Sequence, residues 1–113
     1  MIFKIFFLDN IGYIDPNLLL NRNHKKDKSV DIYSLGTLLW EIMSEEVPYS
    51  KDQNEGIFQL ITRVKGGYRE YDILDIPAEY MDLYKKCWDG NSLNRPSIYD
   101  VSDKLLNMKK LLT

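Results

Sequence analysis

Residues 29–43 read SVDIYSLGTLLWEIM and carry the strongest structural pattern of the chain. Their apolar residues recur at steps of three and four, the spacing of one face of an α-helix; these residues are Ile32, Leu35, Leu38, Leu39, Ile42 and Met43. Val30, Tyr33 and Trp40 add apolar surface on other sides. The pattern predicts a helix over residues 29–45 that is buried around most of its circumference, as in the middle of a larger assembly.

Polar residues and a proline mark the ends of this predicted helix. Ser29 is the expected N-cap, and Asp31 in the first turn complements the positive end of the helix dipole. Pro48 closes the segment, because proline cannot continue a helix.

Further helices are expected on both sides. Asp15 and Pro16 provide an N-cap and a first helical residue for one short turn over residues 16–20. Apolar spacing predicts three longer helices over residues 55–65, 78–88 and 97–112, with Gly66-Gly67 ending the first and Ser97 capping the last. The apolar run at residues 1–8 predicts a buried strand. We therefore expect a mainly α fold with a strand-like N-terminal segment.

Composition bounds the class of protein. The 113 residues carry 15 Lys and Arg against 17 Asp and Glu, a net charge of −2, with 44 % hydrophobic residues. These values fit one globular domain and argue against a strongly basic nucleic-acid or membrane-surface binder. No apolar run reaches the roughly 18–20 residues of a membrane span. One cysteine, Cys87, excludes an internal disulfide and a Cys-cluster zinc site.

Motifs for catalysis or metal binding are weak. The lone histidine, His24, would need Cys87 or a serine to meet it across the fold. Gly66-Gly67 is too short to cradle phosphates. Other groups are expected to be solvated or structural: the basic run Arg22 to Lys28, the acidic residues Asp72, Asp75, Glu79 and Asp82, and Cys87 as a core thiol.

Four motifs in order resemble a known family. Residues 13–17, YIDPN, look like the Y-x-A-P-E end of a kinase activation segment, and residues 29–42 look like the D-x-x-S-x-G central helix. Pro48-Tyr49, and then KCW at 86–88 with NRPS at 94–97, complete the series. The chain from about Gly12 to Leu112 thus resembles the C-terminal half of the large lobe of eukaryotic protein kinases. It follows a lead-in of residues 1–11.

The resemblance implies roles for particular residues. Asp31 would hold the backbone of the catalytic loop, Gly36 would allow close packing, and Trp88 would be structural. Tyr13, Asp15 and Pro16 would lie beside the site where a protein substrate docks. Arg95 would pair with the A-P-E glutamate, but Asn17 stands there, so a bond from a charged to a neutral group is expected. Asp9-Asn10 also replace the usual Gly-Thr.

The kinase motifs for phosphoryl transfer are missing from this sequence. They are the Gly-rich loop, the strand lysine, H-R-D with its asparagine, and D-F-G. ATP and Mg belong to the complete family domain, so no catalytic, cofactor or metal residue is assigned here. We expect the chain to be inactive alone.

Two hypotheses follow from these missing motifs. The chain is either a fragment of a protein kinase, with activity in a longer polypeptide, or a stand-alone remnant that binds a partner protein. An unrelated small helical domain with accidental motifs is a third alternative. Isolated, the chain would expose apolar surface and be prone to self-association. A cytoplasmic location is the default, since no targeting signal is seen.

Overall fold

The computed structural model describes residues 11–19, 27–52 and 54–112. These residues form five α-helices and three short 3-10 helices, and no strand occurs among them. The elements are η1 (Ile11–Tyr13), α2 (Pro16–Leu19), α3 (Lys28–Ser44), η2 (Ser50–Asp52), α4 (Ile57–Lys65), α5 (Ala78–Cys87), η3 (Ser92–Asn94) and α6 (Ile98–Leu112). The predicted mainly α fold, with one short and four longer helices, is confirmed. The strand predicted for residues 1–8 lies outside the described residues, and Ile11 begins a 3-10 helix.

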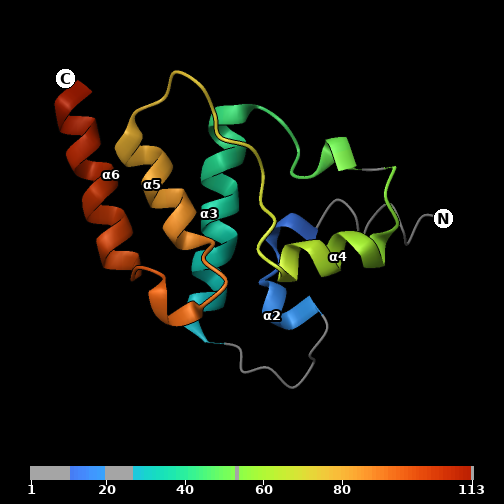
Figure 1. The fold of residues 1–113 in the computed structure, drawn as a ribbon. Coiled ribbons are helices and arrows are strands. Elements are labelled where there is room, and N and C mark those ends of the chain that lie inside the picture. The colour runs from blue at the N-terminus through green and yellow to red at the C-terminus, as the bar shows by residue number, and fades with distance from the viewer. Residues whose placement is uncertain (1–10, 20–26, 53, 113) are drawn as a thin grey trace.

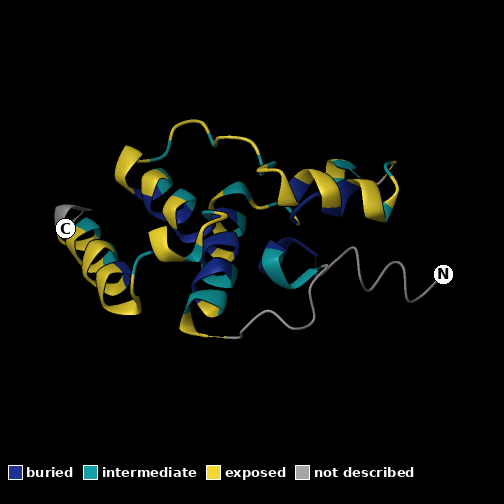
Figure 2. Ribbon diagram, turned by 60° about the horizontal axis from the view of Figure 1, so that its bottom comes forward, coloured by how far each residue is buried: buried dark blue, intermediate teal, exposed yellow. Residues whose placement is uncertain are grey.

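Helix α3 is the central element (Figure 1). Helix α5 packs along one side of it and α6 covers the far side of α5, while η1 lies against α3 and α2 contacts α4. Figure 2 shows that buried residues gather on α3 and on the side of α5 that faces it, whereas α6 is largely exposed. The prediction that residues 29–45 form a central helix is therefore confirmed, although the described residues leave one of its faces uncovered, as shown below.

The ends of α3 differ from the sequence expectation. The N-cap is Asp27, not Ser29, because the Asp27 carboxylate accepts a hydrogen bond from the Ser29 backbone N–H at 2.9 Å. A carboxylate also suits the positive end of the helix dipole. The helix ends at Ser44, where Glu45 adopts the left-handed conformation with φ 58° and its N–H donates to the Glu41 carbonyl. Pro48 therefore lies beyond the helix end rather than forming it.

The other helix boundaries move by one or two residues. Helix α4 begins at Ile57, with Gly56 as its N-cap, and α5 ends at Cys87 with Trp88 as its C-cap. Before α6, the Ser97 hydroxyl accepts the Asp100 N–H at 3.1 Å, which is one half of the capping box expected there.

Two hydrophobic clusters hold these elements together. The first joins α3, α5 and α6, and its buried members are Ile32, Tyr33, Leu39, Trp40, Tyr80, Leu83, Tyr84, Cys87, Trp88 and Val101. The second joins η1, the Pro48-Tyr49 turn and α4, and its buried members are Ile11, Tyr49, Leu60, Ile61 and Val64. Ile11 thus makes η1 part of the second cluster.

Gly36 marks the closest approach of α3 to α5. A Cβ at this position would lie 2.6 Å from the Cys87 Cβ and 3.0 Å from the Tyr84 carbonyl oxygen. Neither neighbour can move freely, since one is backbone and the other is a fully buried side chain. Burial raises the pKa of the Cys87 thiol to about 11, which fits the core role expected for it.

The variant Gly36→Ala is expected to lower the free energy of unfolding by about 1–3 kcal/mol, because the added methyl group forces α3 and α5 apart. Gly66→Ala is the matched control: a Cβ there would lie 3.4 Å or more from its neighbours, at a φ of −80°. Urea denaturation of both variants measures the difference. Equal losses would contradict close packing at Gly36.

Candidate functional site

The segment of residues 11–19 is fastened to α3 by two hydroxyl groups. Ser34 Oγ donates to the Tyr13 carbonyl oxygen at 2.6 Å, and Thr37 Oγ1 donates to the Gly12 carbonyl oxygen at 2.7 Å. Ser34 and Thr37 are three residues apart and therefore lie on one face of the helix. Their contacts fix the backbone path of the residues that the sequence assigns to a substrate-side role.

A buried ion pair anchors the same segment to the other end of the chain. Arg95 Nη1 donates to Asp15 Oδ2 at 2.6 Å and Arg95 Nη2 to Asp15 Oδ1 at 3.2 Å, and both side chains are fully buried. Arg95 also donates from Nε to the Asp89 carbonyl oxygen at 2.8 Å and from Nη1 to the Ser29 carbonyl oxygen at 3.0 Å. A buried pair is stable only when such additional bonds satisfy the remaining donors.

This pairing corrects the sequence expectation for Arg95. The carboxylate partner is Asp15, two residues before Asn17, so the interaction joins two charged groups after all. The Asn17 side chain instead donates from Nδ2 to Asp15 Oδ1 at 3.1 Å and to the Gly90 carbonyl oxygen at 3.2 Å. The sequence does offer an acidic partner for Arg95 next to Pro16, but the family motif places that partner at position 17.

Tyr33 connects this anchor to the core. Its ring is almost fully buried, with the guanidinium carbons of Arg95 and Arg69 at 5.1 Å and 5.3 Å from the ring centre. Arg69 donates to the Trp88 carbonyl oxygen at 2.9 Å and to the Val64 carbonyl oxygen at 2.8 Å. Burial raises the pKa of Tyr33, although the two arginines lower it. The phenol therefore stays neutral at physiological pH.

Trp88 belongs to the first hydrophobic cluster. It is 5 % exposed, and its ring meets the Tyr84 ring edge-on with centres 4.9 Å apart. Its carbonyl oxygen binds Arg69, as described above, so Trp88 joins the end of α5 to the end of α4.

Glu41 provides a buried acceptor that sequence reasoning missed. It lies one turn after Thr37 on the same face of α3. Its Oε1 atom is buried and has no hydrogen-bond partner among the described residues. A carboxylate oxygen in this state can accept a hydrogen bond from a docked N–H group or cation.

Asp31 occupies a different face of α3. It is exposed in the first helical turn and lines a hollow of about 560 Å³ between the starts of α3 and α6. Apolar residues continue from the hollow along α3; Leu35, Leu38 and Ile42, together with Ile98 of α6, are here called the apolar stripe. Leu38, Ile42 and Ile98 are 44 %, 58 % and 53 % exposed. The predicted central helix thus lacks cover on this face among the described residues.

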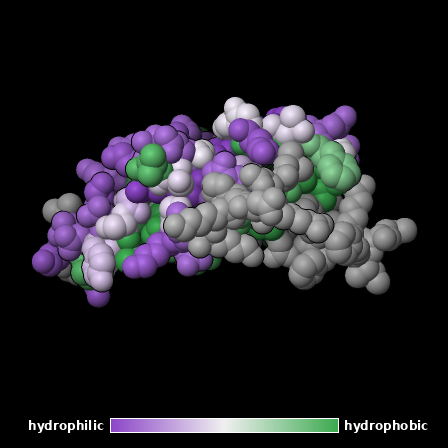
Figure 3. Space-filling view, turned by 90° about the horizontal axis from the view of Figure 1, so that it is seen from below, coloured by the Kyte–Doolittle hydropathy of each residue, from purple (hydrophilic) through white to green (hydrophobic). Residues whose placement is uncertain are grey.

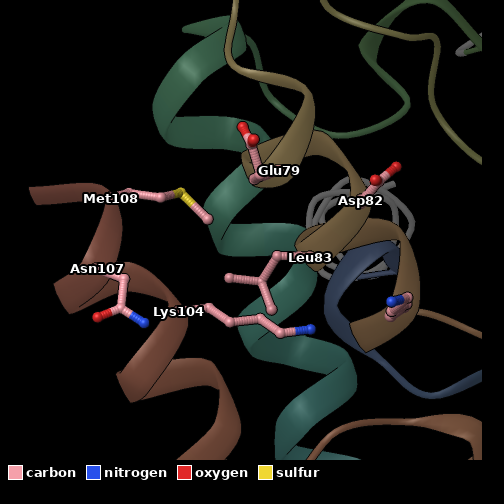
Figure 4. Close-up of a pocket in the computed structure, with 7 residues that line it drawn as sticks. Glu79, Asp82, Leu83, Lys104, Asn107 and Met108 are labelled. Atoms are coloured by element: carbon pink, nitrogen blue, oxygen red, sulfur yellow. The ribbon is translucent and has the colours of Figure 1, made fainter. Parts of the chain in front are cut away.

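Seen from below, hydrophobic groups of the described residues lie among hydrophilic ones (Figure 3). A second hollow, of about 290 Å³, lies between α5 and α6, and Leu83 and Met108 line it together with Glu79, Asp82 and Lys104 (Figure 4). Its charged lining residues carry both signs of charge and offer no preference for an anion or a cation.

The acidic residues singled out in the sequence do not form a metal site in the described part of the chain. No three metal-ligating side chains come together there. Asp72 forms an exposed ion pair with Lys85. No helix of the described ranges is both long enough and apolar enough to cross a membrane. The basic run at 22–26, including His24, lies outside the described residues.

Glu70 supports the turn on which η1 rests. Its Oε1 atom accepts the Tyr49 backbone N–H at 3.1 Å, and Tyr49 has a positive φ of 60°. The neighbouring Pro48 packs closely on Gly12: a Cβ added at position 12 would lie 2.5 Å from the Pro48 Cβ. Burial is the main cause that raises the pKa of Glu70 to about 7, and the nearby carboxylates of Asp52 and Glu46 add to the rise.

Comparison with known proteins identifies the family. The family model of protein tyrosine and serine/threonine kinases matches residues 10–105. The chain belongs to the protein kinase family. The match covers the Asp15–Arg95 anchor and almost all of the described helices, in agreement with the C-terminal helical part of a kinase domain.

Individual kinases show the same similarity. The chain is 32 % identical over 107 residues to a probable LIM domain-containing serine/threonine-protein kinase of Dictyostelium discoideum. It is 31 % identical over 103 residues to a dual specificity protein kinase of the same organism, and 31 % over 98 residues to human ankyrin repeat and protein kinase domain-containing protein 1. These alignments cover 92 %, 90 % and 81 % of the chain but only 16 %, 16 % and 12 % of the relatives.

The structure brings some of the sequence-assigned residues together and separates others. Asp15 pairs with Arg95, Asn17 binds Asp15, and the Tyr13 carbonyl oxygen binds Ser34 of α3. Gly36 instead faces α5, and Asp31 lines the open hollow. Sequence reasoning missed the supporting roles of Tyr33, Arg69 and Glu70, which depend on contacts between distant elements.

Asp15→Asn is expected to lower the free energy of unfolding by about 3–5 kcal/mol, because it leaves the Arg95 charge buried without a counter-charge. Asp72→Asn removes an exposed ion pair and should cost less than about 1 kcal/mol. Chemical denaturation at pH 7 compares the two. Similar small losses would mean that Arg95 does not depend on Asp15.

Glu70 should make stability depend on pH. The folded chain holds the Glu70 proton more tightly than the unfolded chain, so this stabilisation is present below about pH 4.5 and is lost as pH rises through about 7. Melting temperatures between pH 5 and 8 should fall for the natural chain and change less for Glu70→Gln, whose amide oxygen can still accept the Tyr49 N–H. Parallel curves for the two chains would refute this assignment.

Proposed function

We propose that this chain is the substrate-side part of a protein kinase domain, and that the groups that bind ATP and transfer the phosphoryl group lie elsewhere in a longer polypeptide. The exposed apolar stripe on α3 carries the proposal. A central helix with Leu38 and Ile42 about half exposed has a face suited to burial under further protein. Relatives of which the chain covers 16 % or less are consistent with such a missing part.

Asp31 supports the same proposal. It stands at the end of the apolar stripe, exposed and beside the hollow between α3 and α6. By its place in the D-x-x-S-x-G motif, Asp31 would bind the backbone of the catalytic loop. A carboxylate at a helix N-terminus can accept several backbone N–H groups, which makes it a suitable anchor for a loop.

The substrate in this proposal is a protein, which docks beside residues 13–16. Asp15 and Pro16 are buried, whereas Tyr13 and Ile14 are partly exposed and lie on a backbone that Ser34 and the buried anchor hold in place. The exposed part of the segment is therefore preorganised. Preorganisation lowers the entropic cost of binding an extended peptide. ATP and Mg would be held by the missing part, and this chain contributes no group to them. A role in cytoplasmic signalling belongs to the same proposal.

A binding module without catalysis is the second candidate. It is favoured by the fact that residues 11–19 are anchored to described parts of the chain, through Ser34 and Thr37 of α3 and through Arg95 between η3 and α6. In this case the chain would offer the same surface to a partner protein and would have no enzymatic activity of its own.

The mass of the endogenous protein separates these candidates. An antibody against residues 95–113 would capture it, and mass spectrometry would read the intact mass. A mass well above the 13.3 kDa of this chain is expected, with kinase sequence in the added part. A mass of 13.3 kDa would overturn the first proposal and favour the binding module.

The apolar stripe predicts the behaviour of the isolated chain. The double variant Leu38→Gln/Ile42→Gln should reduce both hydrophobic dye binding and self-association, because it interrupts a continuous apolar face. Phe58→Gln/Leu74→Gln is the matched control, since these residues are 74 % and 84 % exposed on other elements. Fluorescence titration and light scattering measure both effects. If the control reduces them as much as the stripe variant, the stripe is not the face that needs cover.

A further inference from the structure

Asp15 Oδ1 receives three of the hydrogen bonds that build the anchor. The Asn17 backbone N–H donates to it at 3.0 Å, Asn17 Nδ2 at 3.1 Å and Arg95 Nη2 at 3.2 Å. The other carboxylate oxygen, Oδ2, accepts a hydrogen bond from Arg95 Nη1 at 2.6 Å. Asn17 thus holds one side of the carboxylate from backbone and side chain together, which leaves little freedom for the Asp15 side chain to rotate.

The Asn17 side-chain amide also donates a second hydrogen bond, to a distant part of the chain. Nδ2 donates to the Gly90 carbonyl oxygen at 3.2 Å, across 73 residues of sequence. Gly90 follows Asp89, whose carbonyl oxygen accepts Arg95 Nε at 2.8 Å. The Asn17 amide and the Arg95 guanidinium therefore bind adjacent carbonyl groups of the loop between α5 and η3. Residues 11–19 are attached to this loop through both side chains.

We propose that Asn17 is a positioning residue that acts through Asp15, and that position 17 requires a hydrogen-bond donor and excludes a carboxylate. Both groups that Nδ2 meets, a carboxylate oxygen and a carbonyl oxygen, are acceptors. An acidic side chain of the same size would turn two attractions into two repulsions, and the Arg95 charge that now faces the Asp15 carboxylate would then face a second carboxylate as well. The glutamate that the kinase motif has at this position would accordingly not restore the anchor here while Asp15 is present.

This inference concerns the substrate-side segment of the proposed function, but it needs no kinase activity. The variant Asn17→Asp changes a donor to an acceptor at nearly constant size. Two carboxylates about 3 Å apart resist simultaneous ionisation, so one of them binds a proton at mildly acidic pH. The protonated acid can then donate again. A loss that is specific to the charge should therefore disappear on acidification, which a loss of packing would not do.

The experiment measures backbone hydrogen exchange of residues 11–19 in the full chain at pH 7.5 and pH 4.5, with intrinsic rates corrected. Asn17→Asp should lose about tenfold or more in protection at pH 7.5 and recover most of it at pH 4.5. Asn17→Leu, which has neither donor nor charge, should lose protection at both pH values. Asn107→Asp adds the same charge on the exposed side of α6 and should match the natural chain.

At each pH, the protection of a variant is compared with that of the natural chain. Effects of the titratable groups that both chains share then cancel. Those facing the anchor in the described residues are Asp15, Arg95, the buried phenol of Tyr33, with Arg69 behind it, and the nearby Asp89. If Asn17→Asp keeps natural protection at pH 7.5, or if it and Asn17→Leu lose protection equally at both pH values, the proposal is wrong. Neither result bears on the proposed kinase role, which the mass of the endogenous protein tests separately.

Discussion

The buried ion pair of Asp15 and Arg95 is the interaction on which the arrangement of the described chain depends. It joins residues 80 positions apart, and it does so with both side chains removed from solvent. A charge in this setting is tolerated only with an opposite charge and with its other hydrogen bonds satisfied. Carbonyl groups of Ser29 and Asp89 satisfy Arg95, which brings the start of α3, the end of α5 and the segment before α2 to one point.

Around this point, aromatic and guanidinium groups connect the two hydrophobic clusters. Tyr33 belongs to the first cluster and lies between Arg95 and Arg69, while Arg69 holds the carbonyl groups at the ends of α4 and α5. An arginine suits this role because its planar group can donate several bonds and still contact a ring face. These contacts connect the helical core to the segment of residues 11–19.

The two sides of α3 differ in how well the described residues cover them. The core side is closed by α5, down to the close approach of Gly36 to Cys87, while no described element covers the apolar stripe. This asymmetry agrees with a kinase family match and with relatives in which the chain accounts for a small share of the length. A helix that has apolar residues on several faces, only some of which are covered, is typical of one part of a larger domain.

The sequence by itself determined the helices and the family, because both depend on local patterns. The three-and-four spacing in residues 29–43 predicts α3 regardless of what covers it, and four ordered motifs indicate a kinase. The error at the start of α3 arose because two polar residues, Asp27 and Ser29, compete as its cap. Only the tertiary structure decided that Asp15 rather than Asn17 pairs with Arg95. Which of two neighbouring side chains reaches a buried charge depends on the backbone path set by Ser34, Thr37 and Pro16, and no local pattern encodes that path.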